Sequence, residues 1–140
     1  MELFTVEVNS GIEELPLRVM TGYAPQDNPT SQEEIKTVNE FYSQLEEQIT
    51  DCQESGCGLI LELDSNAKLG KSIIRGEPNR ISENGKILRD IIERRDLVIV
   101  NTSDKCQGVI TRKRETVKKS EESVIDYVQN TQLERAIKSW

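Results

Sequence analysis

The chain has 140 residues, of which 35% are hydrophobic and 31% are charged, and its formal net charge is −7. This length suggests a single domain, residues 1–140, and leaves little room for two. The acidic balance argues against a large surface that tracks nucleic-acid phosphates, because such surfaces are usually basic. No apolar run approaches the length of a membrane span, and the absence of histidine excludes histidine bases and histidine metal ligands.

The three cysteines indicate the cellular environment of the protein. Cys52, Cys57 and Cys106 are odd in number and match no metal-binding spacing. We interpret them as reduced cysteines of an intracellular protein, cytoplasmic or nuclear.

The first predicted elements are a β-hairpin and a long helix. Apolar residues alternate over residues 4–8, and a polar turn leads into a second strand over residues 15–20. Residues 31–34, Ser-Gln-Glu-Glu, form a capping box, in which a hydroxyl and a carboxylate satisfy helix-end donors reciprocally. Apolar residues then recur at helical spacing from Ile35 to Ile49, which predicts an amphipathic helix of about five turns.

A buried strand with a polar end follows this helix. Residues 59–63 are Leu-Ile-Leu-Glu-Leu, and Asp64 and Asn66 come directly after them. An acid and an amide at the carboxyl end of a strand suit phosphate chemistry. The carboxylate can take a proton from water or hold a divalent cation, and the amide can donate to a phosphate oxygen. The alternative is ordinary turn chemistry, since Asp-Ser-Asn is also favoured in turns.

A long loop and a second helix come next. Residues 65–82 are polar and contain two glycines and a proline, which is typical of a loop. Asn84-Gly85 opens a helix that Asp96 ends, and residues 97–100 form a short apolar strand.

The last third of the chain is predicted to be mostly strand. Residues 109–111 lead as a strand into a basic run, residues 112–119, which is either a solvated loop or strand edge or a local phosphate contact. Residues 123–128 alternate as a final strand. The order of elements predicts an α/β fold, in which helices pack on a layered, mixed β-sheet.

Five motifs stand in the order in which the endonuclease/exonuclease/phosphatase superfamily carries them. Residues 20–25, Met-Thr-Gly-Tyr-Ala-Pro, resemble its Asn-x-Tyr-Ala-Pro strand end, and residues 63–70 resemble its Gly-Asp-Phe-Asn-Ala signature. Residues 84–102 resemble its Asn-Gly to Asn-Thr segment, Thr111 stands where the family often has Thr-Trp, and residues 123–127 resemble Ser-x-Ile-Asp-Tyr. The motifs are most similar to those of the apurinic-type endonuclease domains of non-LTR retrotransposons.

The resemblance, which covers about residues 15–129, implies part of a DNase I-like fold, about half to two-thirds of a four-layer sandwich. It also implies hydrolysis of phosphodiesters, with Mg²⁺ or Mn²⁺ as cofactor and DNA as partner. In such a site Asp64 would orient or deprotonate the attacking water. The amide of Asn66 and the hydroxyl of Tyr23 would hydrogen-bond the scissile phosphate.

Several departures from the family pattern weaken the expected activity. Asp126 would occupy the position that orients the family's catalytic histidine, but the chain has no histidine. The family's metal-binding glutamate has no counterpart in context, and Leu63 and Ser65 replace the signature's glycine and aromatic residue. Thr111 is followed by Arg112 instead of tryptophan, although both would still contact nucleic acid. Because losing one preorganised contact can cost about 100- to 1,000-fold in rate, we expect a truncated domain that is inactive or weakly active alone.

Two other functions are consistent with the sequence. A catalytically degenerate nuclease-fold module would bind a partner protein or self-associate, because a partial fold leaves an apolar sheet face uncovered. A plain α/β domain would carry the motifs by accident, with Tyr23 closing the edge of the core and Asp126 accepting backbone donors in a turn. The nuclease hypothesis predicts that Tyr23, Asp64, Asn66 and Asp126 meet at one edge of the sheet. A plain α/β domain would instead fail to place the strands of Tyr23 and Asp64 side by side.

Overall fold

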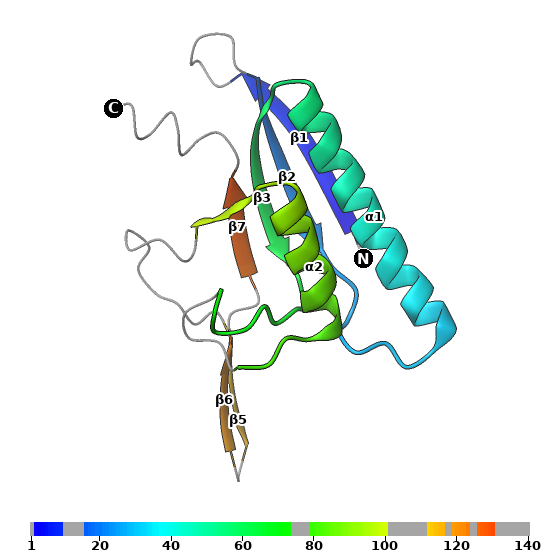
Figure 1. Cartoon of the computed structure of the whole chain (residues 1–140). Helices are drawn as coiled ribbons and strands as arrows, with labels where there is room; N and C mark the ends of the chain where they lie inside the picture. The colour runs from blue at the N-terminus through cyan, green and yellow to red at the C-terminus, as the bar shows by residue number, and fades with distance from the viewer. Residues whose placement is uncertain are drawn as a thin grey trace.

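The computed structural model describes residues 2–9, 16–73 and 79–100, together with the backbone of three strands over residues 112–116, 119–123 and 126–130 (Figure 1). In chain order the elements are β1 (Glu2–Asn9), β2 (Pro16–Tyr23), α1 (Gln32–Glu54), β3 (Gly58–Asp64), α2 (Glu83–Arg94), β4 (Val98–Ile99), β5 (Arg112–Thr116), β6 (Lys119–Ser123) and β7 (Asp126–Asn130). In the described ranges, neither helix is long and apolar enough to cross a membrane.

Five strands form one mixed sheet in the order β1-β2-β3-β7-β4, and β5 pairs with β6 in a separate hairpin. The predicted N-terminal hairpin is confirmed, because β1 and β2 pair antiparallel along their whole length. β2 and β3 run parallel with α1 as their connection, and β7 pairs antiparallel with β3. The predicted α/β class with a layered, mixed sheet is therefore confirmed.

The long helix α1 begins at the predicted capping box. The Ser31 hydroxyl accepts a hydrogen bond from the Glu34 backbone N–H at 3.1 Å, and the Glu34 carboxylate accepts one from the Ser31 backbone N–H at 3.3 Å. The helix has 23 residues, about six turns, and is one turn longer than predicted. Phe41, Leu45 and Ile49 have the predicted helical spacing and are buried, whereas Ile35, where the predicted pattern starts, is 37% exposed.

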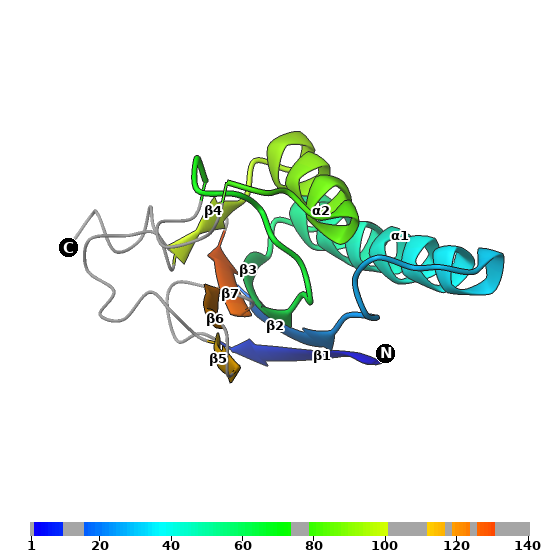
Figure 2. The same cartoon turned by 90° about the horizontal axis from the view of Figure 1, so that it is seen from below.

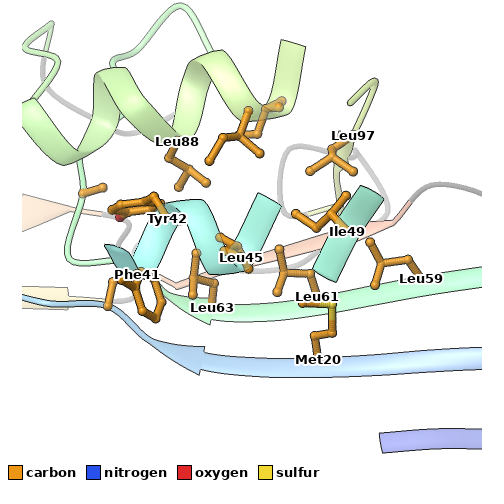
Figure 3. Packing of buried hydrophobic residues seen from close by; sticks show 14 of the residues in the cluster. Met20, Phe41, Tyr42, Leu45, Ile49, Leu59, Leu61, Leu63, Leu88 and Leu97 are labelled. Atoms are coloured by element: carbon orange, nitrogen blue, oxygen red, sulfur yellow. The ribbon is translucent and has the colours of Figure 1, made fainter. Parts of the chain in front are cut away.

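Both helices lie on the same side of the sheet, where they enclose the core (Figures 2 and 3). Met20 of β2 and Leu61 of β3 are register partners, are fully buried, and face this side. Side chains of α1 and α2 fill the space above them, with Leu45 and Leu88 also fully buried. Burial of such side chains stabilises the fold by about 1.5–3 kcal/mol for each residue.

The opposite side of the sheet, which we call the open face, is apolar and has neither helix on it. Register partners share a face of a sheet, so the pairing of Val19 with both Val6 and Ile60 places these residues together. Phe4 and Val6 are 58% and 59% exposed. The apolar residues of the open face are Phe4, Val6, Val8, Leu17, Val19 and Ile60.

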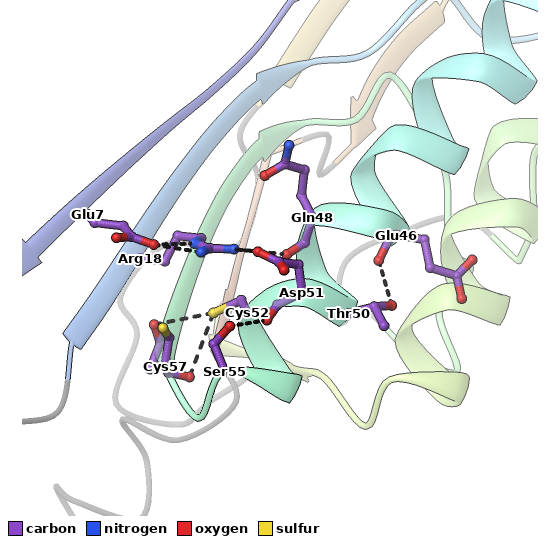
Figure 4. Close-up of polar contacts among 10 residues, drawn as sticks. Glu7, Arg18, Glu46, Gln48, Thr50, Asp51, Cys52, Ser55 and Cys57 are labelled. Atoms are coloured by element: carbon purple, nitrogen blue, oxygen red, sulfur yellow. Dashed lines mark hydrogen bonds and ion pairs between the residues drawn. The ribbon is translucent and has the colours of Figure 1, made fainter.

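A buried arginine near the start of β2 joins β1, β2 and α1 (Figure 4). The Arg18 guanidinium, in a residue only 8% exposed, donates to the Glu7 carboxylate at 2.6 Å and to the Asp51 carboxylate at 2.8 Å. These two carboxylates raise the pKa of Arg18 above its ordinary value, so the side chain remains charged. A buried charge needs such partners because an unpaired one costs several kcal/mol.

The second helix begins one residue earlier than the predicted Asn84-Gly85. Ser82 is the N-cap, and its hydroxyl accepts a hydrogen bond from the Gly85 backbone N–H. The chain leaves the helix at Asp96, whose φ of 53° lies in the left-handed region. The loop predicted over residues 65–82 has no helix or strand in its described parts, 65–73 and 79–82.

Two predictions for the last third were wrong in detail. The single strand predicted over residues 123–128 is divided, because β6 ends at Ser123 and β7 begins at Asp126 in a different sheet. Alternation marks the period of a strand but not its partner, so it cannot show this division. The second difference is that the strand predicted over residues 97–100 is shortened to β4. Part of the basic run forms the strand β5, and the predicted strand 109–111 lies outside the described residues.

Candidate functional site

Three of the predicted site residues form one row across three neighbouring strands. Tyr23 is the parallel register partner of Asp64, and Asp64 is the antiparallel register partner of Asp126. Asn66 follows two residues after the end of β3. This adjacency is what the nuclease hypothesis requires, and accidental motif matches give no reason for it.

The row lies where β2 and β3 both reach their carboxyl ends, which is the position of ligand sites in open α/β sheets. Tyr23 is 52% exposed and lies on the side of β2 that carries the open face, because residues of a strand alternate between faces and Met20 points to the helices. Asp64 is half-buried beside it. Of Asp126 only the backbone is described, so its predicted role stays a prediction.

Asn66 ties the ends of the two strands together. Its side-chain amide donates to the Ala24 backbone carbonyl at 3.0 Å, and the Ala24 backbone N–H donates to the Asp64 carbonyl at 2.9 Å. Asn66 has a φ of 44°, a left-handed conformation that asparagine adopts more readily than most residues. A side-chain amide has two N–H donors. Among the residues that the structure describes, the second N–H of Asn66 has no acceptor, and its contact with a phosphate stays a prediction.

A buried tyrosine that the sequence analysis did not single out anchors the same loop. The Tyr42 hydroxyl of α1 donates to the Ser65 carbonyl at 3.1 Å. Burial raises the pKa of Tyr42, and the negative charges of Asp27 and Asp64 raise it further. The phenol therefore stays protonated as a hydrogen-bond donor, and Asp27 and Asp64 both lie close enough to act on it electrostatically.

The loop after β3 is clamped to the start of α2. The Lys68 backbone N–H donates to the Ser82 hydroxyl at 2.8 Å, and the Ser82 backbone N–H donates to the Lys68 carbonyl at 3.0 Å. Gly85 makes this contact possible, because a Cβ atom there would lie 2.0 Å from the Lys68 carbonyl oxygen. A serine just before a helical pattern signals a cap, but nothing in the sequence indicates that this cap also binds Lys68.

The loop after β2 is held by the same helix end. The Asp27 carboxylate accepts from the Asn84 backbone N–H at 3.1 Å, and the Asn84 side-chain amide donates to the Pro25 carbonyl at 3.0 Å. Asn84 is fully buried, and its side-chain oxygen has no hydrogen-bond partner in the described part of the chain. The start of α2 thus fixes both loops that flank the site.

The described side chains do not complete a metal site. Asp64 supplies an oxygen ligand of the kind that Mg²⁺ prefers, and Mg²⁺ is commonly held by one or two carboxylates with substrate phosphates and water. Among the residues that the structure describes, however, no group of three or more Asp, Glu, Cys or His side chains could hold a metal ion.

The two remaining predicted residues bear on nucleic-acid binding. Arg112 begins β5 opposite Ser123 of β6, and only the backbone of these strands is described. Thr111 lies outside the described residues. Their contact with nucleic acid stays a prediction.

Comparisons with known proteins agree with this geometry. No model of a known protein family matches the chain, and no curated protein sequence matches it. Among solved structures, the endonuclease domain of TRAS1, a telomere-specific non-LTR retrotransposon, is similar over 93% of this chain, with a TM-score of 0.65 and 18% sequence identity. The match covers 50% of that domain's chain. The protein therefore has part of the DNase I-like fold of a retrotransposon endonuclease domain, and it spans about half of that domain's length.

Proposed function

We propose that the chain is a single, partial endonuclease-like domain, a metal-dependent phosphodiester hydrolase that is inactive or weakly active alone. The row of Tyr23, Asp64 and Asp126 at the ends of adjacent strands carries this proposal. The similarity in fold to a retrotransposon endonuclease domain supports it and makes DNA the substrate of choice.

In this proposal Asp64 orients or deprotonates the water that attacks phosphorus. The Tyr23 hydroxyl and the free N–H of Asn66 donate to the non-bridging phosphate oxygens, where negative charge grows in the transition state. Asn66 is well suited to this role because its contact with Ala24 fixes the orientation of the amide. Arg112 and Thr111 would contact the nucleic-acid backbone.

We expect weak activity because a histidine and a complete set of metal ligands are missing from the described part of the candidate site. Asp126 has no histidine to orient, because the sequence contains none. The described residues also supply no complete metal site, so a divalent cation would need ligands beyond them. Each missing contact of this kind costs about 100- to 1,000-fold in rate. We infer that full activity would need catalytic groups that the described residues do not supply.

Cleavage of supercoiled plasmid and of DNA with an abasic site tests the proposal, with Mg²⁺, Mn²⁺ or EDTA. We expect slow, metal-dependent nicking or none by the wild type, and none by Asp64→Ala. Asp90→Ala, an exposed change on α2, is the matched control and keeps the wild-type rate. Rapid cleavage that survives Asp64→Ala contradicts the assignment of the site.

The open face supports a second candidate function, that of a nuclease-fold module that self-associates or binds a partner protein. Contiguous apolar surfaces of this kind usually mark an interaction site, and Val8 is 41% exposed beside the more exposed Phe4 and Val6. Sedimentation of the wild type, Val6→Glu and the control Ile35→Glu on α1 tests it. Association that Val6→Glu alone abolishes supports this function, and a wild type that stays monomeric at high concentration contradicts self-association.

A further inference from the structure

The lysine and arginine side chains that the structure describes fall into two groups, those with and those without a carboxylate partner. Residues 2–9, 16–73 and 79–100 contain nine lysines and arginines. Six of them form ion pairs with carboxylates, namely Arg18, Lys36, Lys86, Arg89, Arg94 and Arg95. Lys68, Lys71 and Arg80 have no carboxylate partner among the described residues. All three belong to the loop 65–82, which begins directly after Asp64.

Backbone hydrogen bonds fix the positions of these three cations in the loop. Lys68 and Arg80 lie at or near the contact with Ser82, and Lys71 lies in a turn. The Lys68 backbone is hydrogen-bonded in both directions to Ser82, and Arg80 lies two residues before that clamp. The Ile73 backbone N–H donates to the Gly70 carbonyl at 3.1 Å, so the exposed Lys71 lies at the centre of a turn. Such fixed backbone positions reduce the entropy lost when the side chains bind a ligand.

The net charge of −7 conceals a strong division along the chain. Residues 1–64 carry 14 acidic and 2 basic residues, whereas residues 65–140 carry 11 acidic and 16 basic residues. The loop 65–82 lies on the basic side of this division.

The arrangement suits an extended polyanion better than a single small anion. A compact anion site usually needs free backbone N–H groups at a helix start. At the start of α2, the Asn84 and Gly85 N–H groups already donate to Asp27 and Ser82. The three cations without a described carboxylate partner instead lie along a loop that starts at the candidate site, as contacts to successive phosphates would.

We propose that Lys68, Lys71 and Arg80 form a phosphate-tracking surface that binds the backbone of a nucleic-acid strand beside the Asp64 site. The identity of the polyanion rests on the proposed function, but the binding requires neither a metal nor hydrolysis. The contacts carry no sequence information, because phosphates are the same at every position.

Salt-dependent binding in EDTA tests this surface. The probe is a fluorescently labelled DNA duplex of about 20 base pairs, followed by anisotropy over a salt series. The triple variant Lys68→Gln, Lys71→Gln, Arg80→Gln is expected to lower the slope of log K against log salt by about 2 to 3, since each phosphate contact contributes about 0.9.

The matched control is Lys36→Gln, Lys86→Gln, Arg89→Gln, which removes two lysines and one arginine from exposed ion pairs elsewhere. Both variants change the net charge equally, and surface ion pairs contribute little to stability. A slope lowered only in the loop variant supports the surface. Equal slopes in the two variants, or a wild type that does not bind at low salt, overturn it.

The cleavage assay separates this inference from the proposed function. If the slope falls only in the loop variant while rapid cleavage survives Asp64→Ala, the surface stands and the catalytic proposal fails. If the wild type cleaves DNA and the loop variant keeps the slope of the control, the catalytic proposal stands and the surface is overturned.

Discussion

Gly85→Ala tests the contact that places α2 against the loop after β3. Glycine is normally a poor choice inside a helix, and alanine is more favourable by about 1 kcal/mol. At this position, however, the added Cβ would lie 2.0 Å from the carbonyl oxygen of Lys68 and 2.8 Å from its carbonyl carbon. Both are backbone atoms, so the helix start and the loop must separate.

The expected cost follows from what that separation breaks. The two hydrogen bonds between Lys68 and Ser82 contribute about 1 kcal/mol each, and a steric misfit in a packed site costs about 1–3 kcal/mol. After the gain in helix propensity is subtracted, Gly85→Ala should lower the free energy of unfolding by about 3 kcal/mol.

Urea denaturation followed by circular dichroism measures this change as a shift of the midpoint. Gly56→Ala is the control, because Gly56 has a φ of 72° and no atom within 4 Å of a built Cβ. Strain alone should cost about 1–2 kcal/mol there. If Gly85→Ala is as stable as the wild type, the clamp between α2 and the loop is not formed.

Three further predictions concern other contacts. The Arg94 guanidinium holds the pKa of Glu46 below its ordinary value of 4.5, so this pair stabilises the fold above about pH 4.5, and the stabilisation is lost as the pH falls through the lowered pKa. On acidification the unfolding free energy of Glu46→Gln should therefore decrease less than that of the wild type. An equal decrease in both proteins would count against the pair. Tyr42→Phe should lose about 1 kcal/mol with faster amide exchange around Ser65, and unchanged exchange would contradict the anchoring role. Burial raises the pKa of Cys52 to about 11, so at about pH 8 iodoacetamide should label this thiol only as fast as the protein unfolds, and immediate labelling would refute its burial.

Local sequence signals were sufficient for the hairpin and the two helices. The capping box at Ser31 and the apolar spacing along α1 depend on neighbours within a few residues, and the structure reproduces both except at Ile35, which is exposed. The β2–β3 adjacency could also be predicted, because a strand, a helix and a second strand usually form a parallel pair.

Contacts between distant residues could not be predicted from the sequence. The Asp27 carboxylate accepts a hydrogen bond from the backbone of Asn84, 57 residues later at the start of α2, and no local pattern encodes this pairing. The division of residues 123–128 between two sheets was missed for the same reason. Of the candidate site, the row of strand ends was predictable from motif order, whereas the clamp at Ser82 depends on how the loop returns to α2.

The central position of β7 has a consequence for how the chain folds. β7 lies between β3 and β4, so the middle of the sheet is completed by residues 126–130, and Leu63 must find Tyr127 across 64 residues. Non-local pairings of this kind slow folding, because the entropy of closing a long loop is lost before the contact forms. During synthesis one edge of β3 therefore stays unpaired until residues 126–130 have left the ribosome, and the emerging chain carries an exposed strand edge that favours aggregation.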